Sequence, residues 1–169
     1  MAYSSYDEAE ADAPRALGSV VETDRGSLPF ALIHGEALVA CAAWALGDAG
    51  VTAVDLGTSW AGIVDAGEPF VLHDPLCPMT PADFIASCVR QAVERDQVVV
   101  GVRQSTVASP IVLPAAAVAA LDDLPTLDFP ALVEFLRGRF PVEAVEAPPG
   151  ADRVASESDV RDLEARTAR

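Results

Sequence analysis

The sequence predicts a single α/β domain with three layers, in which helices cover both faces of a mostly parallel sheet. Short apolar runs rich in valine, isoleucine and leucine alternate with longer segments whose apolar residues recur at helical spacing. This alternation is typical of parallel sheets, because each parallel connection needs a crossover that is usually a helix. The chain has 169 residues and no internal repeat, so we expect one such domain over residues 15–169.

The N-terminal part predicts a tail, a strand, a helix and a second strand. Residues 1–14 mix small and acidic residues without a period of 2 or 3.6, which favours a disordered acidic tail. The apolar run at 16–22 predicts the first strand, and the apolar spacing at 37–45 predicts a helix that stops at the glycines near residue 50. Residues 51–56 then predict a buried strand.

The middle of the chain repeats the order strand, helix, strand. An apolar run at 70–72 precedes Thr80, whose hydroxyl we expect to cap a helix over residues 81–95. A fully apolar strand is expected at 97–102. The inward face of the helix is expected to consist of Phe84, Ile85, Cys88, Val89 and Ala92.

The last part of the chain supplies further strands and helices. Residues 111–113 and 142–145 predict strands. Helices are expected at 114–121, at 129–137 before Gly138, and after the capping box that opens at Ser156.

The charge of the chain excludes several classes of function. Its 26 acidic and 11 basic residues give a net charge of −15, which repels the phosphates of nucleic acids and anionic membranes. Every basic residue is arginine, so a P-loop lysine, a Schiff-base lysine and a lysine clamp on a triphosphate are all excluded. We therefore expect no nucleic-acid partner and no membrane partner.

The cysteines and the start of the chain indicate the compartment. Cys41, Cys77 and Cys88 are an odd number without close pairing, and each lies in or beside an apolar segment. The first residues form no basic, apolar signal region, and no run of about 18 apolar residues occurs. These features predict reduced thiols and a cytoplasmic protein.

One candidate site is the segment from Gly57 to Ala61, which nearly matches the G-x-S-x-G turn that presents a serine nucleophile after a strand. That turn requires a helix directly after the serine and a histidine base late in the chain. Residues 61–69 hold two glycines and a proline and predict no regular helix, and the last histidine is His73. We therefore expect a polar loop in which Trp60 covers an edge.

A second candidate is the loop that carries His73, Asp74 and Cys77 at the end of a strand. Structural zinc needs four ligands and catalytic zinc usually three, and only His34 or Cys41, neither at ligand spacing, would complete the set. We therefore expect a strand-end aspartate that caps a turn, and we expect His34 to be a turn residue. A single aspartate on hydrated Mg²⁺ stays open, because that ion needs only one or two carboxylates plus phosphate oxygens.

Three segments, in order, resemble one enzyme family. Residues 28–38 read LPFALIHGEAL and precede an alanine-rich helix and the segment GVTAVD, residues 71–78 read VLHDPLCP, and residues 153–160 read RVASESDV. They are similar to the family patterns PKxFLPLGGxPLL with AGVxxIxV, VHDAARP and KITTPEDL. Over roughly residues 16–164 the chain thus resembles the 2-C-methyl-D-erythritol 4-phosphate cytidylyltransferases of isoprenoid biosynthesis. The resemblance implies a nucleotidyltransferase-like fold.

The chain departs from that family at the site. The family's glycine-rich phosphate loop is absent from residues 20–26. Of the positions of its two lysines, one falls near Arg25, or near Ser27 and Leu28, and the other on Ala108. Cys77 falls on the arginine of the family's His-Asp motif, and the segment between the second and third strands is far shorter. Asp74 falls on the family's metal-binding aspartate and is the one catalytic residue retained. The resemblance thus implies a vestigial site of Asp74, Arg25, Arg103 and Arg153.

These observations give a leading hypothesis and two alternatives. The leading hypothesis is a catalytically inactive, cytidylyltransferase-like domain that acts through a protein partner or through self-association, with no cofactor and no bound nucleotide. The first alternative is an active 2-C-methyl-D-erythritol 4-phosphate cytidylyltransferase, or a related nucleotidyltransferase, that uses CTP, Mg²⁺ on Asp74 and arginines in place of the lysines. The second is a small-molecule sensor with its ligand in the crevice at the strand ends. For Trp60 and Phe70 we expect buried rings rather than an exposed patch.

Overall fold

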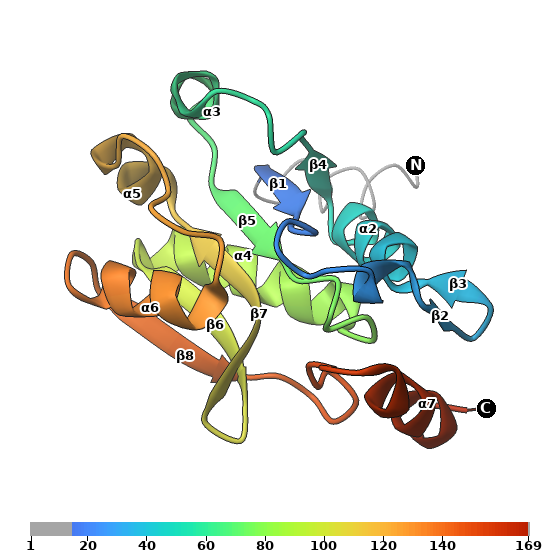
Figure 1. Cartoon of the computed structure of the whole chain (residues 1–169). Helices are drawn as coiled ribbons and strands as arrows, with labels where there is room; N and C mark the ends of the chain where they lie inside the picture. The colour runs from blue at the N-terminus through green and yellow to red at the C-terminus, as the bar shows by residue number, and fades with distance from the viewer. Residues whose placement is uncertain (1–14, 169) are drawn as a thin grey trace, which may run out of the picture.

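The computed structural model describes residues 15–168, so the tail predicted for residues 1–14 lies outside the described residues and stays a prediction. Figure 1 shows a central sheet with helices on both sides. No helix within the described range combines the length and the apolar character needed to span a membrane. The elements, in chain order, are β1 (Ala16–Val20), the 3₁₀ helix η1 (Leu28–Phe30), β2 (Leu32–Ile33), β3 (Glu36–Ala37), α2 (Leu38–Asp48), β4 (Val51–Ala53), α3 (Trp60–Ala66), β5 (Phe70–His73), α4 (Ala82–Arg95), β6 (Val98–Arg103), β7 (Thr106–Leu113), α5 (Ala115–Ala120), α6 (Phe129–Arg137), β8 (Val142–Glu146) and α7 (Glu157–Arg166).

The main sheet has six strands in the order β4-β1-β5-β7-β6-β8. β1 pairs in parallel with β4 and β5, and β6 pairs in parallel with β8. β7 lies between β5 and β6 and is antiparallel to both. The prediction of a mostly parallel sheet is confirmed, and a small antiparallel ribbon of β2 and β3 stands beside it.

Alternate residues of the central strands face opposite layers, as the three-layer prediction requires. Phe70 and Leu72 of β5 belong to the core beneath α3, α5 and α6, whereas Val71 belongs to the core beneath α2 and α4. Figure 1 shows α6 in front of the sheet and α4 behind it. A third, smaller core joins α7 to β2 and α2 through Ile33, Leu38, Leu76, Val154, Val160 and Leu163.

The hairpin between β6 and β7 was not predicted. The sequence indicates a strand only at 111–113, but β7 begins at Thr106. Gln104 and Ser105 connect the two strands, and both adopt positive φ angles, 50° and 69°. Two such residues form the tight turn that matches the twist of a hairpin, but glycine and asparagine usually occupy these positions, so the sequence carries no clear signal.

The prediction that residues 61–69 form no regular helix is wrong, because α3 runs over Trp60–Ala66. The Ser59 side chain accepts a hydrogen bond from the Gly62 N–H at 3.2 Å and caps this helix. Gly67, with φ 66°, ends it in the left-handed conformation that favours glycine. The two glycines that argue against a helix therefore have other roles: Gly62 donates the hydrogen bond to the capping serine, and Gly67 ends the helix.

Other predicted boundaries shift by a few residues. Helix α4 has Pro81 as its N-cap, and the Thr80 hydroxyl instead donates to the Cys77 carbonyl at 2.8 Å. β4 ends at Ala53 rather than at residue 56. By contrast, α6 starts and ends where the sequence predicts, and the Ser156 side chain caps α7 by accepting from the Asp159 N–H at 3.1 Å.

Candidate functional site

Asp74 directly follows β5, at the carboxyl end of a strand in the middle of the sheet. Its carboxylate is fully buried, and each of its oxygens accepts a hydrogen bond from an arginine. Oδ1 accepts from Arg25 Nε at 3.4 Å, and Oδ2 accepts from Arg153 Nε at 2.9 Å. Oδ1 also accepts from the Leu76 N–H at 2.9 Å, so Asp74 caps a turn as the sequence predicts. We name Asp74, Arg25 and Arg153 the Asp74 cluster.

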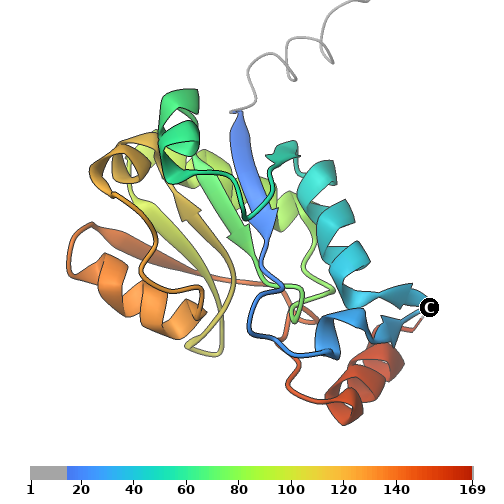
Figure 2. The ribbon, with the colours of Figure 1, turned by 45° about the horizontal axis from the view of Figure 1, so that its top comes forward.

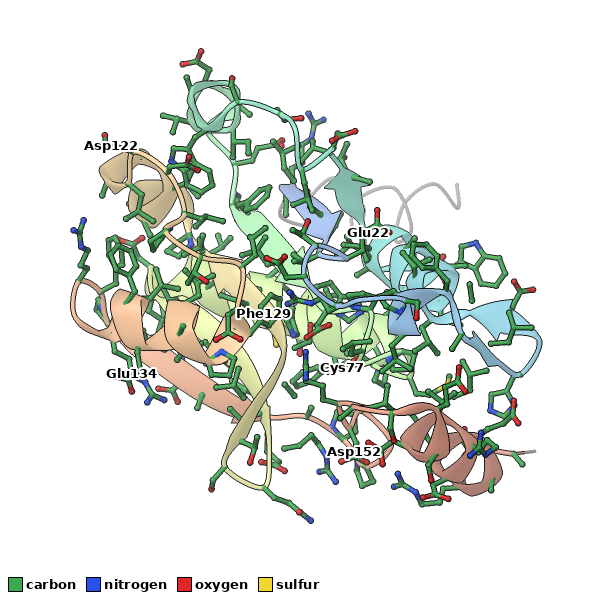
Figure 3. The ribbon with its side chains drawn as sticks, viewed as in Figure 1. Glu22, Cys77, Asp122, Phe129, Glu134 and Asp152 are labelled. Carbon is green, nitrogen blue, oxygen red and sulfur yellow. The ribbon has the colours of Figure 1, made fainter. Side chains whose placement is uncertain are left out.

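Arg25 reaches the cluster from the loop after β1, where the resemblance noted in the sequence places the phosphate loop of the cytidylyltransferases. Its guanidinium also donates to the carbonyls of Thr23 at 2.8 Å and Leu127 at 2.9 Å, and it stacks on the Phe129 ring at 5.3 Å from the centroid. Figure 3 labels Phe129, whose ring Arg25 stacks on, and Cys77 on the loop after β5. Only 5% of the Arg25 side chain is exposed, so this arginine is a buried part of the fold.

Arg153 approaches from the segment that leads into α7. The neighbouring Val154 N–H donates to the Leu76 carbonyl at 2.7 Å, which ties this segment to the loop after β5. The Arg153 side chain is 42% exposed, and among the described residues its one side-chain hydrogen bond is from Nε to Asp74. Its two terminal nitrogens therefore face solvent beside the cluster.

Arg103 does not join the Asp74 cluster. It donates to Asp152 at 3.0 Å, to Glu146 at 3.0 Å and to the Ala147 carbonyl at 3.1 Å, which ties β6 to the segment after β8. Partial burial alone would raise the pKa of Asp152, but hydrogen bonds from Arg103 and Arg166 outweigh it and lower that pKa below its ordinary value. Arg103 therefore forms ion pairs with Glu146 and Asp152 rather than with Asp74.

His73 lies beside Asp74 but belongs to the core. Its Nδ1 is 2.6 Å from the Ser109 hydroxyl oxygen, which also accepts the Asp74 N–H at 2.9 Å. Burial lowers the pKa of His73 to about 4, although the negative charge of Asp74 opposes the shift. The imidazole is therefore neutral at pH 7, and its Nε2 has no hydrogen-bond partner among the described residues.

Cys77 does not turn this loop into a metal site. Burial, reinforced by the charge of Asp74, raises the pKa of its thiol, so the thiolate that metals prefer is disfavoured. Within residues 15–168, no three histidine, cysteine, aspartate or glutamate side chains gather closely enough to hold a metal ion. His34 contacts Thr167 at 2.8 Å and occupies a turn with φ 49°, as predicted.

Ser59 does not form a nucleophile site either, although the helix that the elbow motif requires is present in α3. Its oxygen is used as the helix cap, and the two histidines contact Thr167 and Ser109 instead. Trp60 does not cover a loop edge: its indole N–H donates to the Leu121 carbonyl at 2.8 Å, and its ring meets the buried Phe70 ring edge-on at 5.8 Å. The Phe70 ring is buried as expected, whereas the Trp60 ring packed against it is only partly buried.

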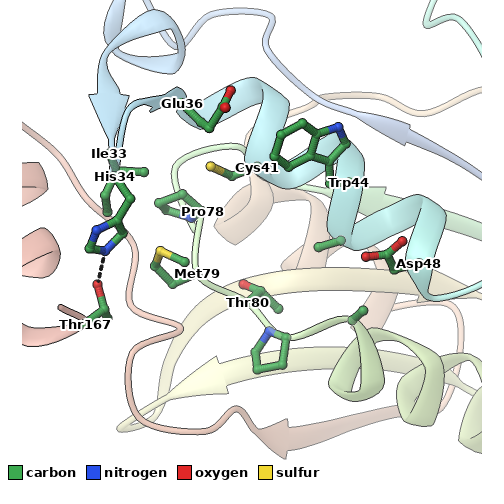
Figure 4. A pocket seen from close by; sticks show the side chains of 13 residues that line it. Ile33, His34, Glu36, Cys41, Trp44, Asp48, Pro78, Met79, Thr80 and Thr167 are labelled. Atoms are coloured by element: carbon green, nitrogen blue, oxygen red, sulfur yellow. Dashed lines mark hydrogen bonds between the residues drawn. The ribbon is translucent and has the colours of Figure 1, made fainter. Parts of the chain in front are cut away.

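Two cavities lie near this end of the sheet. The smaller, about 120 Å³, sits where β1, β4 and β5 end and is lined by Ser19, Asp55, Trp60 and Asp123 among others. The larger, about 760 Å³, lies between α2 and the loop that follows Cys77, and Asp74 does not line it. Figure 4 shows this larger cavity, which we name the α2 groove.

Several contacts of the Asp74 cluster were not predicted. The Leu127 carbonyl and the Phe129 ring hold Arg25, and the Ser109 hydroxyl holds the backbone of Asp74. None belongs to a motif, and Leu127 lies 102 residues from Arg25, so no local signal identifies them. The family resemblance puts a lysine at Ala108, and that residue is a buried alanine of β7.

Comparison with known proteins gives a fold and no sequence family. No family model matches the chain, and no curated protein matches it in sequence. Solved structures do match: 4-diphosphocytidyl-2C-methyl-D-erythritol synthase from Anaerococcus prevotii has a TM-score of 0.68 at 11% identity, covering 95% of this chain and 99% of that chain. The 2-C-methyl-D-erythritol 4-phosphate cytidylyltransferase from Thermus thermophilus has a TM-score of 0.61 at 18% identity, with 89% and 98% covered. A Methanothermobacter nucleotidyl transferase has a TM-score of 0.65 at 13% identity, with 91% and 99% covered. The chain therefore has the fold of the methylerythritol phosphate cytidylyltransferases and related nucleotidyltransferases.

Proposed function

We propose that this protein is a catalytically inactive domain with the nucleotidyltransferase fold, which acts by binding a protein partner. The observation that carries the proposal is the Asp74 cluster. Two guanidinium groups and one backbone N–H already occupy the carboxylate that the resemblance assigns to the metal. A Mg²⁺ ion would have to displace Arg25 or Arg153 to reach it, so these residues do not fit a metal site.

The surroundings of the cluster support the same proposal. Transfer of a nucleotidyl group relies on cations placed around the phosphates, and this chain has no lysine and a net charge of −15. The crevice at the strand ends has about 120 Å³, whereas pockets for drug-sized ligands have about 300–1,000 Å³. The small size of this crevice and the protein's negative charge both favour the absence of a bound nucleoside triphosphate.

The test is calorimetric titration of the protein with CTP, with and without Mg²⁺. We expect no heat of binding at millimolar CTP in either case. Micromolar binding that requires Mg²⁺, and that disappears in Asp74→Asn but persists in Asp65→Asn on the exposed side of α3, would overturn the proposal. Circular dichroism of both variants checks that the loss is not one of folding.

An active nucleotidyltransferase is the second candidate, and the exposure of Arg153 favours it. Its two solvent-facing nitrogens could hold a phosphate next to Asp74, because arginine forms two parallel bonds with such groups. That function requires release of pyrophosphate when CTP and methylerythritol phosphate are supplied, and Asp74→Asn should abolish this release.

A small-molecule sensor at the strand-end crevice is tested by a thermal-shift scan of nucleotides and sugar phosphates, run on the same samples.

A further inference from the structure

Helix α2 is apolar around its whole circumference. Leu38, Ala42 and Leu46 face the core, and none of the residues from Leu38 to Gly47 is charged. A surface helix usually presents a polar face to water, and a helix that is apolar all round is usually covered on every side. In the described structure, however, the side of α2 that faces away from the sheet is open.

This open side lines the α2 groove. Cys41, Trp44, Ala45 and Asp48 share one face of the helix, since they follow the spacing i, i+3, i+4, i+7, and all four line the groove. Trp44 is 60% exposed. Figure 4 shows Trp44 and Cys41 on α2 facing the groove, with Pro78 and Met79 on the opposite wall. The groove is therefore a mostly apolar trough between a helix and a loop.

Exposed apolar residues continue beside the groove. Phe30, in η1, is 59% exposed, and Leu32, in β2, is 63% exposed. Both elements lie next to α2 in Figure 2, where the blue segments adjoin the cyan helix. Exposed apolar side chains on elements beside an apolar groove are typical of sites of protein interaction.

The negative charge at the two ends of the groove favours a positively charged partner. Glu36 lies just before α2 and Asp48 is its last residue; both are exposed, and no arginine lines the groove. The C-terminal end of the helix dipole adds partial negative charge near Asp48. Helix α2 has 11 residues, which at about 1.5 Å per residue make a length of roughly 16 Å, about three turns of an α-helix, and Glu36 lies two residues before it.

We propose that the α2 groove binds a basic amphipathic helix of a partner protein. Its apolar side chains, at spacing i, i+3 or i+4, and i+7, fill the trough against Trp44, and its lysines or arginines pair with Glu36 and Asp48. This inference rests on the proposed protein-binding function and assigns the site and the partner's chemistry. A second copy of this chain is disfavoured, because each copy carries −15 and the two acidic ends would repel each other. The acidic segment 1–14 is disfavoured for the same reason.

The experiment selects peptides against the whole protein from a displayed library of random 16-residue sequences. We expect enriched peptides to combine an apolar helical stripe with lysine or arginine near both ends. Synthetic copies should bind with micromolar Kd by fluorescence anisotropy, and more weakly as salt is raised. Bound peptide should slow alkylation of Cys41 severalfold, because Cys41 is the partly exposed cysteine while Cys77 and Cys88 are buried.

Matched variants test the two parts of the site separately. Trp44→Ser should weaken binding at least tenfold, whereas Val93→Ser, which removes another exposed apolar side chain on α4, should change it less than twofold. Glu36→Lys with Asp48→Lys should also weaken binding at least tenfold. Asp65→Lys with Glu94→Lys makes the same change in net charge on α3 and α4 and should have little effect. Thermal melts establish that each variant folds.

The possible results of these experiments distinguish failure of the α2 groove as the binding site from failure of the proposed protein-binding function. Peptides that bind regardless of Trp44 and leave Cys41 reactive would overturn this site while the protein-binding function stands. Selected peptides that are acidic would overturn the proposed partner chemistry. A dimer in sedimentation equilibrium that Trp44→Ser abolishes would assign the groove to a second copy instead. Failure to select any peptide would overturn the inference, whereas Mg²⁺-dependent CTP binding or Asp74-dependent release of pyrophosphate would overturn the proposed function beneath it.

Discussion

At the scale of single residues, the decisive feature is that one buried carboxylate holds two arginines of different exposure. Arg25 is almost completely buried and its guanidinium makes three contacts besides the one with Asp74, whereas the Arg153 side chain is 42% exposed. Removing one partner of a buried ion pair leaves an uncompensated charge, while an exposed pair contributes little. The two arginines should therefore differ sharply in their effect on stability.

We expect Arg25→Met to lower the free energy of unfolding by about 3–5 kcal/mol, because Asp74 then loses its buried partner. Arg153→Met should cost about 1 kcal/mol or less, since water reaches the guanidinium that it removes. Urea unfolding followed by circular dichroism measures both. Arg90→Met, on the exposed face of α4, controls for loss of a positive charge. An equal loss for Arg25 and Arg153 would contradict this account of the cluster.

His73 should make the protein less stable in mild acid. Its pKa is about 4 in the folded chain and 6.5 in the unfolded chain, so the unfolded chain binds a proton first as the pH falls. The stability is fully present above pH 6.5 and is lost as the pH falls toward 4, by about 3 kcal/mol in total. Urea unfolding at pH 7, 5.5 and 4.5 measures this loss. His73→Gln should flatten the dependence over that interval, and a dependence that His73→Gln leaves as steep would contradict this assignment.

At the scale of elements, the β6–β7 hairpin determines how the sheet is built. β7 reverses direction at Gln104 and Ser105 and returns between β5 and β6, and the pairing register shifts between Val100 and Val102. Gly101 lies at that shift, and a Cβ atom there would collide with the Ser109 carbonyl. Ser109 in turn bonds His73 and the Asp74 backbone, so this irregular part of the hairpin supports the Asp74 cluster.

Gly101→Ala should therefore destabilise the protein by about 1–3 kcal/mol, because backbone atoms cannot move aside as a flexible side chain would. Gly47→Ala is the matched control. It lies in α2 with no atom near its added Cβ, and replacing a helix glycine should stabilise by up to about 1 kcal/mol. The measurement is the thermal midpoint of each variant; a neutral Gly101→Ala would show that the hairpin relaxes freely.

At the scale of the whole molecule, a net charge of −15 is carried by a chain of 169 residues whose basic residues are all arginine. Such a charge keeps copies apart in solution, and it also destabilises the compact state by self-repulsion. Ion pairs at Asp152, where Arg103 and Arg166 meet one carboxylate, oppose this effect locally. Of the acids within residues 15–168, four take part in ion pairs, namely Asp74, Glu134, Glu146 and Asp152, so repulsion should dominate.

Added salt should accordingly stabilise the fold. Raising ionic strength from about 0.01 M to 0.15 M shortens the screening length from about 30 Å to 8 Å, which weakens repulsion between distant acids. We expect the thermal midpoint to rise by a few degrees on addition of NaCl, and to rise less in Asp65→Lys with Glu94→Lys, whose charge is smaller. A midpoint that falls with salt would show that the arginine ion pairs outweigh the repulsion.

The sequence by itself determined the fold class and the elements with strong local signals. Helix α6 starts at Phe129 and ends before Gly138 as predicted, and the Ser156 cap of α7 is confirmed, because capping and amphipathic spacing act within a few residues. The family resemblance also picked out Asp74, Arg25 and Arg153, although their role as a vestigial site stays a prediction.

Only the tertiary structure decided how these residues meet. Arg25 and Arg153 lie 49 and 79 residues from Asp74 in the chain, and their convergence depends on strand order and on the docking of the segment before α7. The tertiary structure also decided the direction of β7, the helix at Trp60–Ala66 and the open apolar face of α2. Local sequence patterns report burial and backbone preference, whereas contacts across the sheet depend on which segments the fold brings together.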